Sequence, residues 1–114
     1  EKGYFKILGR DSVDIIKSGS YKISALEIEN ALLKHPLIKE CSVVGIEDKK
    51  WGEIIAVSII LVSNQNLSLK DLQKWSSNFL SDYKVPRKMN IVPKLPTNSM
   101  GKINKLEVKK SFPN

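Results

Sequence analysis

The order of residues 13–23 constrains the fold of this chain more than any other feature. Two short apolar segments, 13–16 and 21–23, flank a polar run at 17–20 that contains Gly19. A polar, glycine-containing loop between two such segments is typical of a β-hairpin. The run carries more polar and turn-forming residues than a purely structural hairpin needs, which is a first indication of a functional site.

Helix-capping patterns recur at three places. In each, a Ser or Asn precedes an acidic residue by three positions, a spacing that lets the two side chains satisfy backbone N–H groups reciprocally. The three pairs are Ser24 with Glu27, Ser68 with Asp71, and Asn104 with Glu107. They predict three helices, of which the first ends before Pro36 and the last ends near Phe112.

Three further segments have the composition of strands. Residues 41–46 and 54–62 are the two central ones, and residues 89–92 can form a third. The segment 54–62 is almost continuously apolar, which favours burial on both faces. Long strand–helix–strand crossovers are absent. The sequence therefore predicts an α+β fold, in which a small three-stranded sheet has helices packed against it and is preceded by the hairpin.

Length and composition limit the class of protein. A chain of 114 residues is expected to form one domain. Its longest apolar run, 54–62, is too short to span a bilayer, and its one cysteine excludes an internal disulfide and fits a reducing compartment. The chain lacks an initiator Met and a signal peptide, so we expect it to be a fragment of a longer protein.

The net charge of +7 is unevenly distributed. From Lys84 to the C-terminus there are eight basic residues and one acidic residue, Glu107, whereas residues 1–83 carry equal numbers of each sign. A surface of this kind attracts anions. Nucleotide cofactors and nucleic acids both qualify as partners.

Two motifs resemble the C-terminal domain of the adenylate-forming acyl-CoA synthetases. The first resembles the motif that opens that domain, and its parts are Gly9-Arg10, 16–19, Tyr21-Lys22 and 25–29. The second, at 95–105, is similar to the terminal lysine motif of that family. Two ordered motifs are a stronger signal than either alone. Residues 12–19 and 98–102 look most similar to the malonyl-CoA synthetase branch.

The resemblance implies a domain organisation and a reaction. Residues 1–9 would end a large N-terminal adenylation domain, residues 10–13 would be a hinge, and residues 14–114 would form a mobile C-terminal lid domain. The implied enzyme joins ATP and a short carboxylic acid, with malonate as a candidate, to give acyl-AMP. Coenzyme A then displaces AMP. Mg²⁺ would accompany ATP and be bound mostly by the large domain.

Lys102 is the candidate catalytic residue. Adenylation brings two anions together, and an ammonium group is a compact charge with three donors that can contact both the acyl oxygen and the α-phosphate. Gly101 would let the backbone approach closely, and Asn98 and Ser99 keep the loop polar. A Gly-Lys pair alone is more often a solvated turn, so the assignment depends on the surrounding motif.

The resemblance also assigns the residues around the hinge. Arg10 matches the arginine that holds the ribose hydroxyls of ATP or AMP, a task that suits a planar fork of five donors. Its alternative role is a surface salt bridge. Asp11 and Ser12 occupy the hinge region, although one additional residue before Lys17 also leaves Val13 as a possible pivot.

The hairpin loop matches the segment that lines the pantetheine tunnel of coenzyme A after the lid has rotated. The residues concerned are Lys17, Ser18, Gly19, Ser20 and Lys22. Most relatives carry glycine where Ser20 stands, so the tunnel is expected to be slightly narrower here. The alternative is an ordinary β-turn.

Several alternatives remain open from the sequence. Lys49, Lys50 and Trp51 are interpreted as a solvated connection, although the ring and amines could instead contact the adenosine or phosphates of coenzyme A. The acceptor could be a carrier-protein phosphopantetheine. A basic nucleic-acid-binding module is disfavoured because Phe112 is the one aromatic residue after Lys84. The expected location is the cytoplasm, with the mitochondrial matrix as the alternative.

Overall fold

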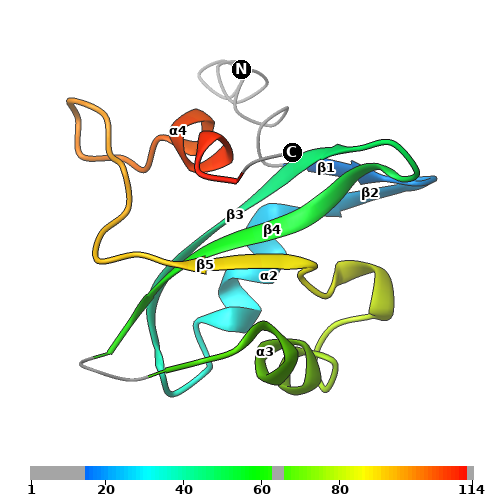
Figure 1. The fold of residues 1–114 in the computed structure, drawn as a ribbon, viewed down its shortest axis with the longest axis horizontal. Coiled ribbons are helices and arrows are strands. Elements are labelled where there is room, and N and C mark those ends of the chain that lie inside the picture. The colour runs from blue at the N-terminus through cyan, green and yellow to red at the C-terminus, as the bar shows by residue number, and fades with distance from the viewer. Residues whose placement is uncertain (1–14, 63–65, 113–114) are drawn as a thin grey trace, which may run out of the picture.

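The computed structural model describes residues 15–62 and 66–112 as a sheet with helices on both faces (Figure 1). In chain order the strands and helices are β1 (Ile15–Ser18), β2 (Tyr21–Ser24), α2 (Ala25–Leu32), β3 (Ile38–Asp48), β4 (Gly52–Leu61), α3 (Leu69–Ser76), the 3₁₀ helix η2 (Asp82–Lys84), β5 (Lys88–Ile91) and α4 (Lys105–Lys110). The predicted α+β class is confirmed.

The sheet differs from the prediction in one respect, because the leading hairpin is part of it. The strand order is β2-β1-β4-β3, and β5 also pairs with β4, in parallel. β1 joins β4 where Ser18 lies opposite Gly52. The predicted three-stranded sheet with a separate hairpin is therefore one five-stranded sheet. Pairing across Ser18 and Gly52 joins segments far apart in the sequence, which no local pattern reveals.

The hairpin is held in place by apolar packing. Ile16 and Ile23 lie opposite each other in register and are fully buried, and full burial of each such side chain contributes about 1.5–3 kcal/mol. Gly45 of β3 makes room for this contact, since a Cβ atom there would lie 2.9 Å from Ile16 Cγ2. The hairpin is thus fixed against the long strands.

Both faces of the sheet are covered, as the apolar segment 54–62 predicted. Along β4, Ile55, Val57 and Ile59 pack in the cluster that includes residues of α2 and α3. Ala56 packs on the other face with Val108 and Phe112, at α4. Figure 1 shows α4 above the strands and α3 below them. The sheet therefore separates α4 from α2 and α3.

The three predicted helices begin as expected. Glu27 N–H donates to Ser24 Oγ at 3.2 Å, and Ser68 and Asn104 accept equivalent bonds from residues three positions later. The carboxylate of Glu27 instead pairs with Lys84, at 2.9 Å. The capping partner predicted from the sequence thus serves a long-range ion pair.

Part of the basic C-terminal third is neutralised within the fold. Lys84, Lys105 and Lys110 each form an ion pair with a glutamate.

Cys41 is buried, and burial is the main cause that raises the pKa of its thiol to about 12, so it stays protonated in the core. Within the described ranges, each helix is too short or too polar to cross a bilayer.

Candidate functional site

The turn between β1 and β2 is tied to the turn between β3 and β4. Gly19 has φ of 61°, a left-handed conformation that glycine adopts at little cost. The N–H group of Gly19 donates to the carbonyl oxygen of Trp51 at 2.7 Å. Two residues earlier, in β1, Lys17 N–H donates to Glu53 Oε1 at 2.8 Å. The position of the hairpin turn is therefore set by residues more than thirty positions away.

Trp51 lies beside this turn rather than in a detached loop. Asp48 Oδ2 accepts hydrogen bonds from the N–H groups of Lys50 and Trp51, at 3.0 and 2.9 Å, and so holds the connection in a tight turn. A Cβ atom at Gly19 would lie 3.5 Å from the indole ring, which is 42% exposed. Lys50 Nζ and the Arg87 guanidinium lie 5.4 and 5.9 Å from the ring centroid, in cation–π range.

A second aromatic contact, between two tyrosines, lies beside the same β1–β2 turn. Tyr21 and Tyr83 stack with their ring centroids 3.9 Å apart and their planes 12° from parallel. The neighbouring Lys84 donates to Glu27, and this hydrogen bond raises the pKa of the lysine. Between the walls lies a cavity of about 260 Å³, lined by Ser18, Gly19, Ser20, Tyr21, Trp51, Asp82, Tyr83 and Arg87. We call it the hairpin cavity.

The structure divides the predicted coenzyme A residues into two groups. Ser18, Gly19 and Ser20 line the hairpin cavity. Lys17 and Lys22 lie opposite each other in the register, one position along from the buried pair of isoleucines. Because side chains alternate along a strand, both lysines face away from the core side of the hairpin, and both are exposed. They are therefore not part of the cavity wall.

The loop that carries Lys102 is closed mostly by its own hydrogen bonds. Asn98 Oδ1 accepts from the N–H groups of Met100 and Lys102, at 2.8 and 3.1 Å, and Asn98 N–H donates to Lys102 O at 2.8 Å. At its base Thr97 pairs with Ile103. The amide side chain of Asn98 thus does more than keep the loop polar, because it organises the loop.

Gly101 has a conformational role in addition to the one expected, which stays a prediction. Its φ is 81°, and a Cβ atom there would have no neighbour within 4 Å. The left-handed backbone of the turn favours glycine, and within the described residues no other segment approaches it. Lys102 itself is exposed. Across residues 15–62 and 66–112, its ammonium group makes no hydrogen bond or ion pair.

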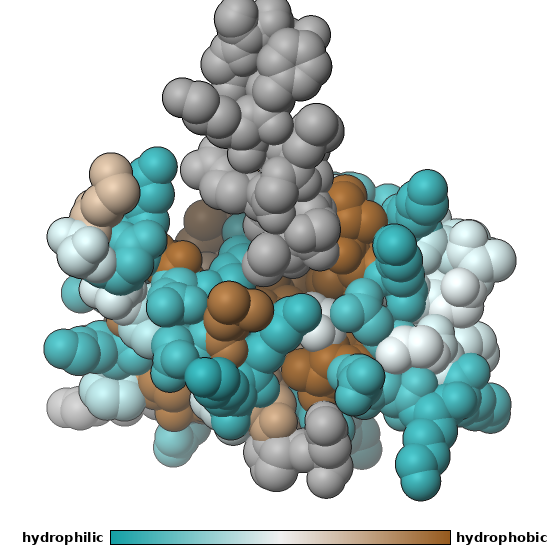
Figure 2. Space-filling view, turned by 90° about the horizontal axis from the view of Figure 1, so that it is seen from above, coloured by the Kyte–Doolittle hydropathy of each residue, from teal (hydrophilic) through white to brown (hydrophobic). Residues whose placement is uncertain are grey.

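The two candidate loops lie far apart. In Figure 1 the orange loop that precedes α4 is at the left end of the molecule, and the β1–β2 turn is at the right end. Figure 2 shows a mostly hydrophilic surface above the sheet, with separate hydrophobic areas between the polar side chains. Met100, Ile103 and Leu106 contribute exposed apolar surface near Lys102, at 78%, 37% and 61% exposure.

The predicted hinge and nucleotide residues cannot be placed here. Arg10, Asp11, Ser12 and Val13 lie outside the described residues. The described part of the chain has no group of three or more His, Cys, Asp or Glu side chains that could hold a metal ion.

Part of the hairpin cavity was not predicted from the sequence. The connection 49–51 is interpreted there as solvated, with Trp51 folded back on the sheet and a coenzyme A contact as the alternative, and Tyr83 and Arg87 are not singled out. A local signal for Trp51 did exist, because Asp48 three residues earlier and Gly52 one residue later are turn formers. Tyr83 and Arg87 reach the cavity through long-range packing, so no local signal marks them.

Comparison with known proteins agrees with this geometry. The family described as AMP-binding enzyme C-terminal domain matches residues 27–102. A probable CoA ligase of Humulus lupulus is 47% identical over 98% of this chain, and a malonate–CoA ligase of Arabidopsis thaliana is 44% identical over all of it. The chain covers 20% of each, so it spans about a fifth of the length of these curated relatives.

A solved structure supports the same assignment. The crystal structure of an acyl-CoA synthetase of Brucella canis is 33% identical, with a TM-score of 0.79 over 86% of this chain and 19% of that one. On this evidence, the chain belongs to the family of C-terminal domains of AMP-binding enzymes.

Proposed function

We propose that this chain is the mobile C-terminal lid domain of an AMP-forming CoA ligase, and that it acts with a large N-terminal adenylation domain. The relatives named as CoA ligases support this proposal. The observation that carries it is that the Lys102 loop and the β1–β2 turn, whose residues line the hairpin cavity, lie at opposite ends of the domain (Figure 1). A lid that rotates can then present one end in each step of a two-step reaction.

In the first step the Lys102 loop closes on the large domain. A carboxylate oxygen of the acid attacks the α-phosphorus of ATP, and pyrophosphate leaves. The exposed ammonium of Lys102, without an ion-pair partner in the described ranges, is available to contact both anions. Such an electrostatic contact is strongest when water is excluded from the closed site. Arg10 is proposed to hold the ribose hydroxyls.

In the second step the lid rotates about residues 10–13 and presents the hairpin cavity. The sulfur of coenzyme A attacks the acyl carbonyl carbon, and AMP leaves. Ser18, Gly19 and Ser20 line the passage for the pantetheine arm. Trp51 offers a ring on which the adenine can stack, and Lys50 and Arg87 beside it offer charges for the phosphates. The alternative role that the sequence left open for Trp51 is thus the one that the geometry favours.

Substrate and cofactors follow from the same assignment. The malonate–CoA ligase of Arabidopsis thaliana supports malonate as the acid. The CoA ligase names favour free coenzyme A over a carrier-protein phosphopantetheine as the acceptor. Mg²⁺ would supply charge neutralisation on the ATP phosphates and would be held by the large domain. The cytoplasm, or alternatively the mitochondrial matrix, stays a prediction.

The test compares this chain with the same domain joined to its large domain. Both proteins are incubated with ATP, Mg²⁺ and malonate, then with coenzyme A, and pyrophosphate and acyl-CoA are measured. We expect product only from the two-domain protein, because one lysine on a lid has no ATP site to close on. Acetate and a carrier protein serve as the competing acid and acceptor. Pyrophosphate release by the isolated chain would contradict the proposal.

A further inference from the structure

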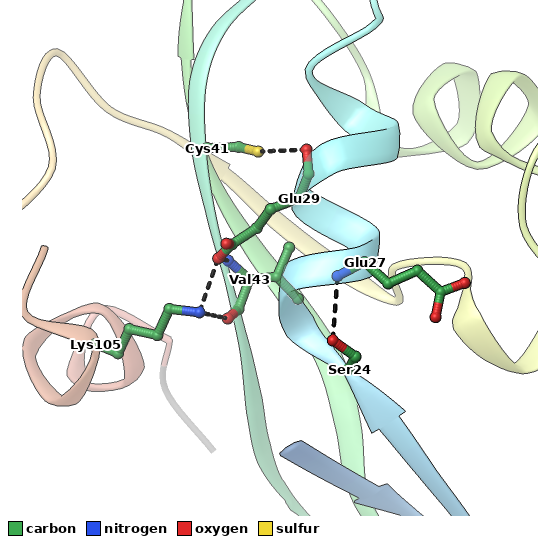
Figure 3. Close-up of polar contacts among 6 residues, drawn as sticks. All are labelled: Ser24, Glu27, Glu29, Cys41, Val43 and Lys105. Carbon is green, nitrogen blue, oxygen red and sulfur yellow. Dashed lines mark hydrogen bonds and ion pairs between the residues drawn. The ribbon is translucent and has the colours of Figure 1, made fainter. Parts of the chain in front are cut away.

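An ion pair crosses the edge of the sheet close to the Lys102 loop. Glu29 projects from α2 toward β3, which is the edge strand of the sheet. Its Oε2 accepts a hydrogen bond from Val43 N–H at 2.8 Å. The same oxygen lies 2.8 Å from Lys105 Nζ, and both side chains are only 14% exposed. Figure 3 shows the carboxylate and the ammonium meeting beside β3.

Lys105 completes the arrangement from the opposite layer. It is the first residue of α4, and its ammonium also donates to Val43 O at 3.1 Å. Because β3 is an edge strand, the N–H and C=O groups of Val43 have no further strand to pair with. The side chains of Glu29 and Lys105 satisfy both of these groups. α2 and α4 lie on opposite faces of the sheet. The pair thus ties the two helix layers together around the sheet edge.

This connection lies at the base of the Lys102 loop. Asn104, between the loop and Lys105, donates its N–H to Pro96 O at 2.8 Å and so closes the loop base. The far end of α4 is held separately, through buried Val108 and Phe112 and through Ser111, whose Oγ accepts from Asn90 at 3.1 Å. Lys105 therefore fixes the end of α4 from which the loop departs.

We propose that Glu29 and Lys105 are positioning residues that aim the Lys102 loop for the adenylation step. This inference rests on the proposed function. The loop is closed by hydrogen bonds within itself, so its shape survives without the pair, but its direction relative to the sheet depends on where α4 begins. Since a displacement of about 1 Å can cost on the order of a hundredfold in rate, loss of this anchor should slow adenylation. The thioester step uses the other end of the domain and should not respond.

The experiment measures the two half-reactions separately in the two-domain protein. Glu29→Gln and Lys105→Met remove one charge each with little change in shape. We expect each to lower acid-dependent pyrophosphate exchange by about tenfold and to leave acyl-CoA formation from supplied acyl-AMP unchanged. The double variant should lose no more than either single one, because the two residues act as a unit. Lys105→Arg, which keeps a cation, should recover most of the rate.

Two controls separate a positioning role from a structural one. Glu107→Gln breaks the exposed ion pair with Lys110 on the same helix and should change neither half-reaction. Cleavage by trypsin after Lys102 reports on the loop without any catalysis and should become faster in Glu29→Gln. Equal losses in both half-reactions, or no loss in adenylation, would overturn the inference. If the wild-type protein is inactive in both half-reactions, the proposed function is wrong instead. In that case faster cleavage in Glu29→Gln would still support the anchoring of the loop, and unchanged cleavage would overturn it.

Discussion

The hairpin cavity and the Lys102 loop are built in different ways. The cavity draws its walls from the β1–β2 turn, the β3–β4 turn and η2, which meet through contacts such as Gly19 N–H to Trp51 O and the stack of Tyr21 on Tyr83. The Lys102 loop is closed by one amide side chain, that of Asn98, within a few residues of sequence. The hairpin cavity therefore depends on contacts between distant residues, whereas the Lys102 loop depends on contacts within the loop itself.

This difference fits the two tasks proposed for the domain. A ligand as long as coenzyme A needs a surface with several fixed walls, which long-range packing provides. A single charge that completes a site on another domain needs only a stable loop and the right direction. Changes in the cavity should therefore affect both folding and thioester formation, whereas changes in the loop should affect adenylation with little effect on stability.

The largest effect is expected from Lys102→Ala in the two-domain protein. Loss of one charge aimed at the transition state typically costs about 10²–10³ in rate, so adenylation should fall at least this far. Acyl-CoA formation from supplied acyl-AMP should be retained, because the proposed rotation brings the lysine to the site only in the first step. Pyrophosphate exchange and acyl-CoA yield are measured side by side.

A melting curve is the control for this variant. Because Lys102 is exposed, its removal should leave the midpoint of thermal unfolding within about 1 °C of the wild type. If both half-reactions fall together without a change in the midpoint, the two ends of the domain are not used separately.

The sequence predicted the elements built from local patterns. The three helix starts follow from Ser24, Ser68 and Asn104, each of which accepts the expected backbone hydrogen bond. The apolar run at 54–62 predicted the strand buried on both faces. The motif of the Lys102 loop is contiguous in the sequence, so the loop could be singled out there, although the catalytic role of Lys102 stays a prediction. Arg10 and the hinge also stay predictions, and they lie outside the described residues.

What the sequence did not predict depends on contacts between distant residues. Trp51 and Arg87 meet across the cavity although they are 36 positions apart. Strand alternation separates Lys17 and Lys22 from the cavity, although the linear motif groups them with it. Glu29 lies in the first of the two sequence motifs and its partner, Lys105, in the second, but neither motif indicates that the two residues pair. Periodicity and capping carry no information on such pairs.

Ser20→Leu should produce the next largest effect, and on the other half-reaction. The side chain lines the hairpin cavity, so a larger one should narrow the pantetheine passage and lower the rate of acyl-CoA formation by about tenfold or more. Adenylation should be unchanged. Ser20→Gly is the matched control and should be neutral or slightly faster in the second step. An unchanged acyl-CoA yield in Ser20→Leu would reduce this loop to a structural turn.

Trp51→Ala tests the cavity wall with a smaller expected change. Stacking of a base on an aromatic side chain contributes about 1–3 kcal/mol, so the KM for coenzyme A should rise by roughly tenfold while the KM for ATP stays constant. Trp51→Phe keeps an aromatic face and should recover most of the affinity. A rise in KM for ATP instead would place the adenine of ATP, and not that of coenzyme A, on this ring.

The smallest effect comes from a matched pair of glycine substitutions, Gly19→Ala and Gly101→Ala, that compares the two regions directly. Both residues have positive φ, 61° and 81°, and an alanine in this conformation costs about 1–2 kcal/mol. The space around each is sufficient, since the nearest atom to a new Cβ is 3.5 Å away at Gly19 and none lies within 4 Å at Gly101.

The two variants should differ in how far the surrounding structure can relax to relieve the backbone strain. Gly19 is joined to Trp51 and to the β1–β2 ladder, so its turn cannot relax without moving the sheet, and the thermal midpoint should fall by about 4–8 °C for each kcal/mol lost. The loop around Gly101 can adjust by itself, so the midpoint should change by less than half as much. Thermal unfolding of the two variants of this chain, followed by circular dichroism, measures the difference. Equal shifts would mean that the Lys102 loop is as much a part of the folded core as the hairpin is.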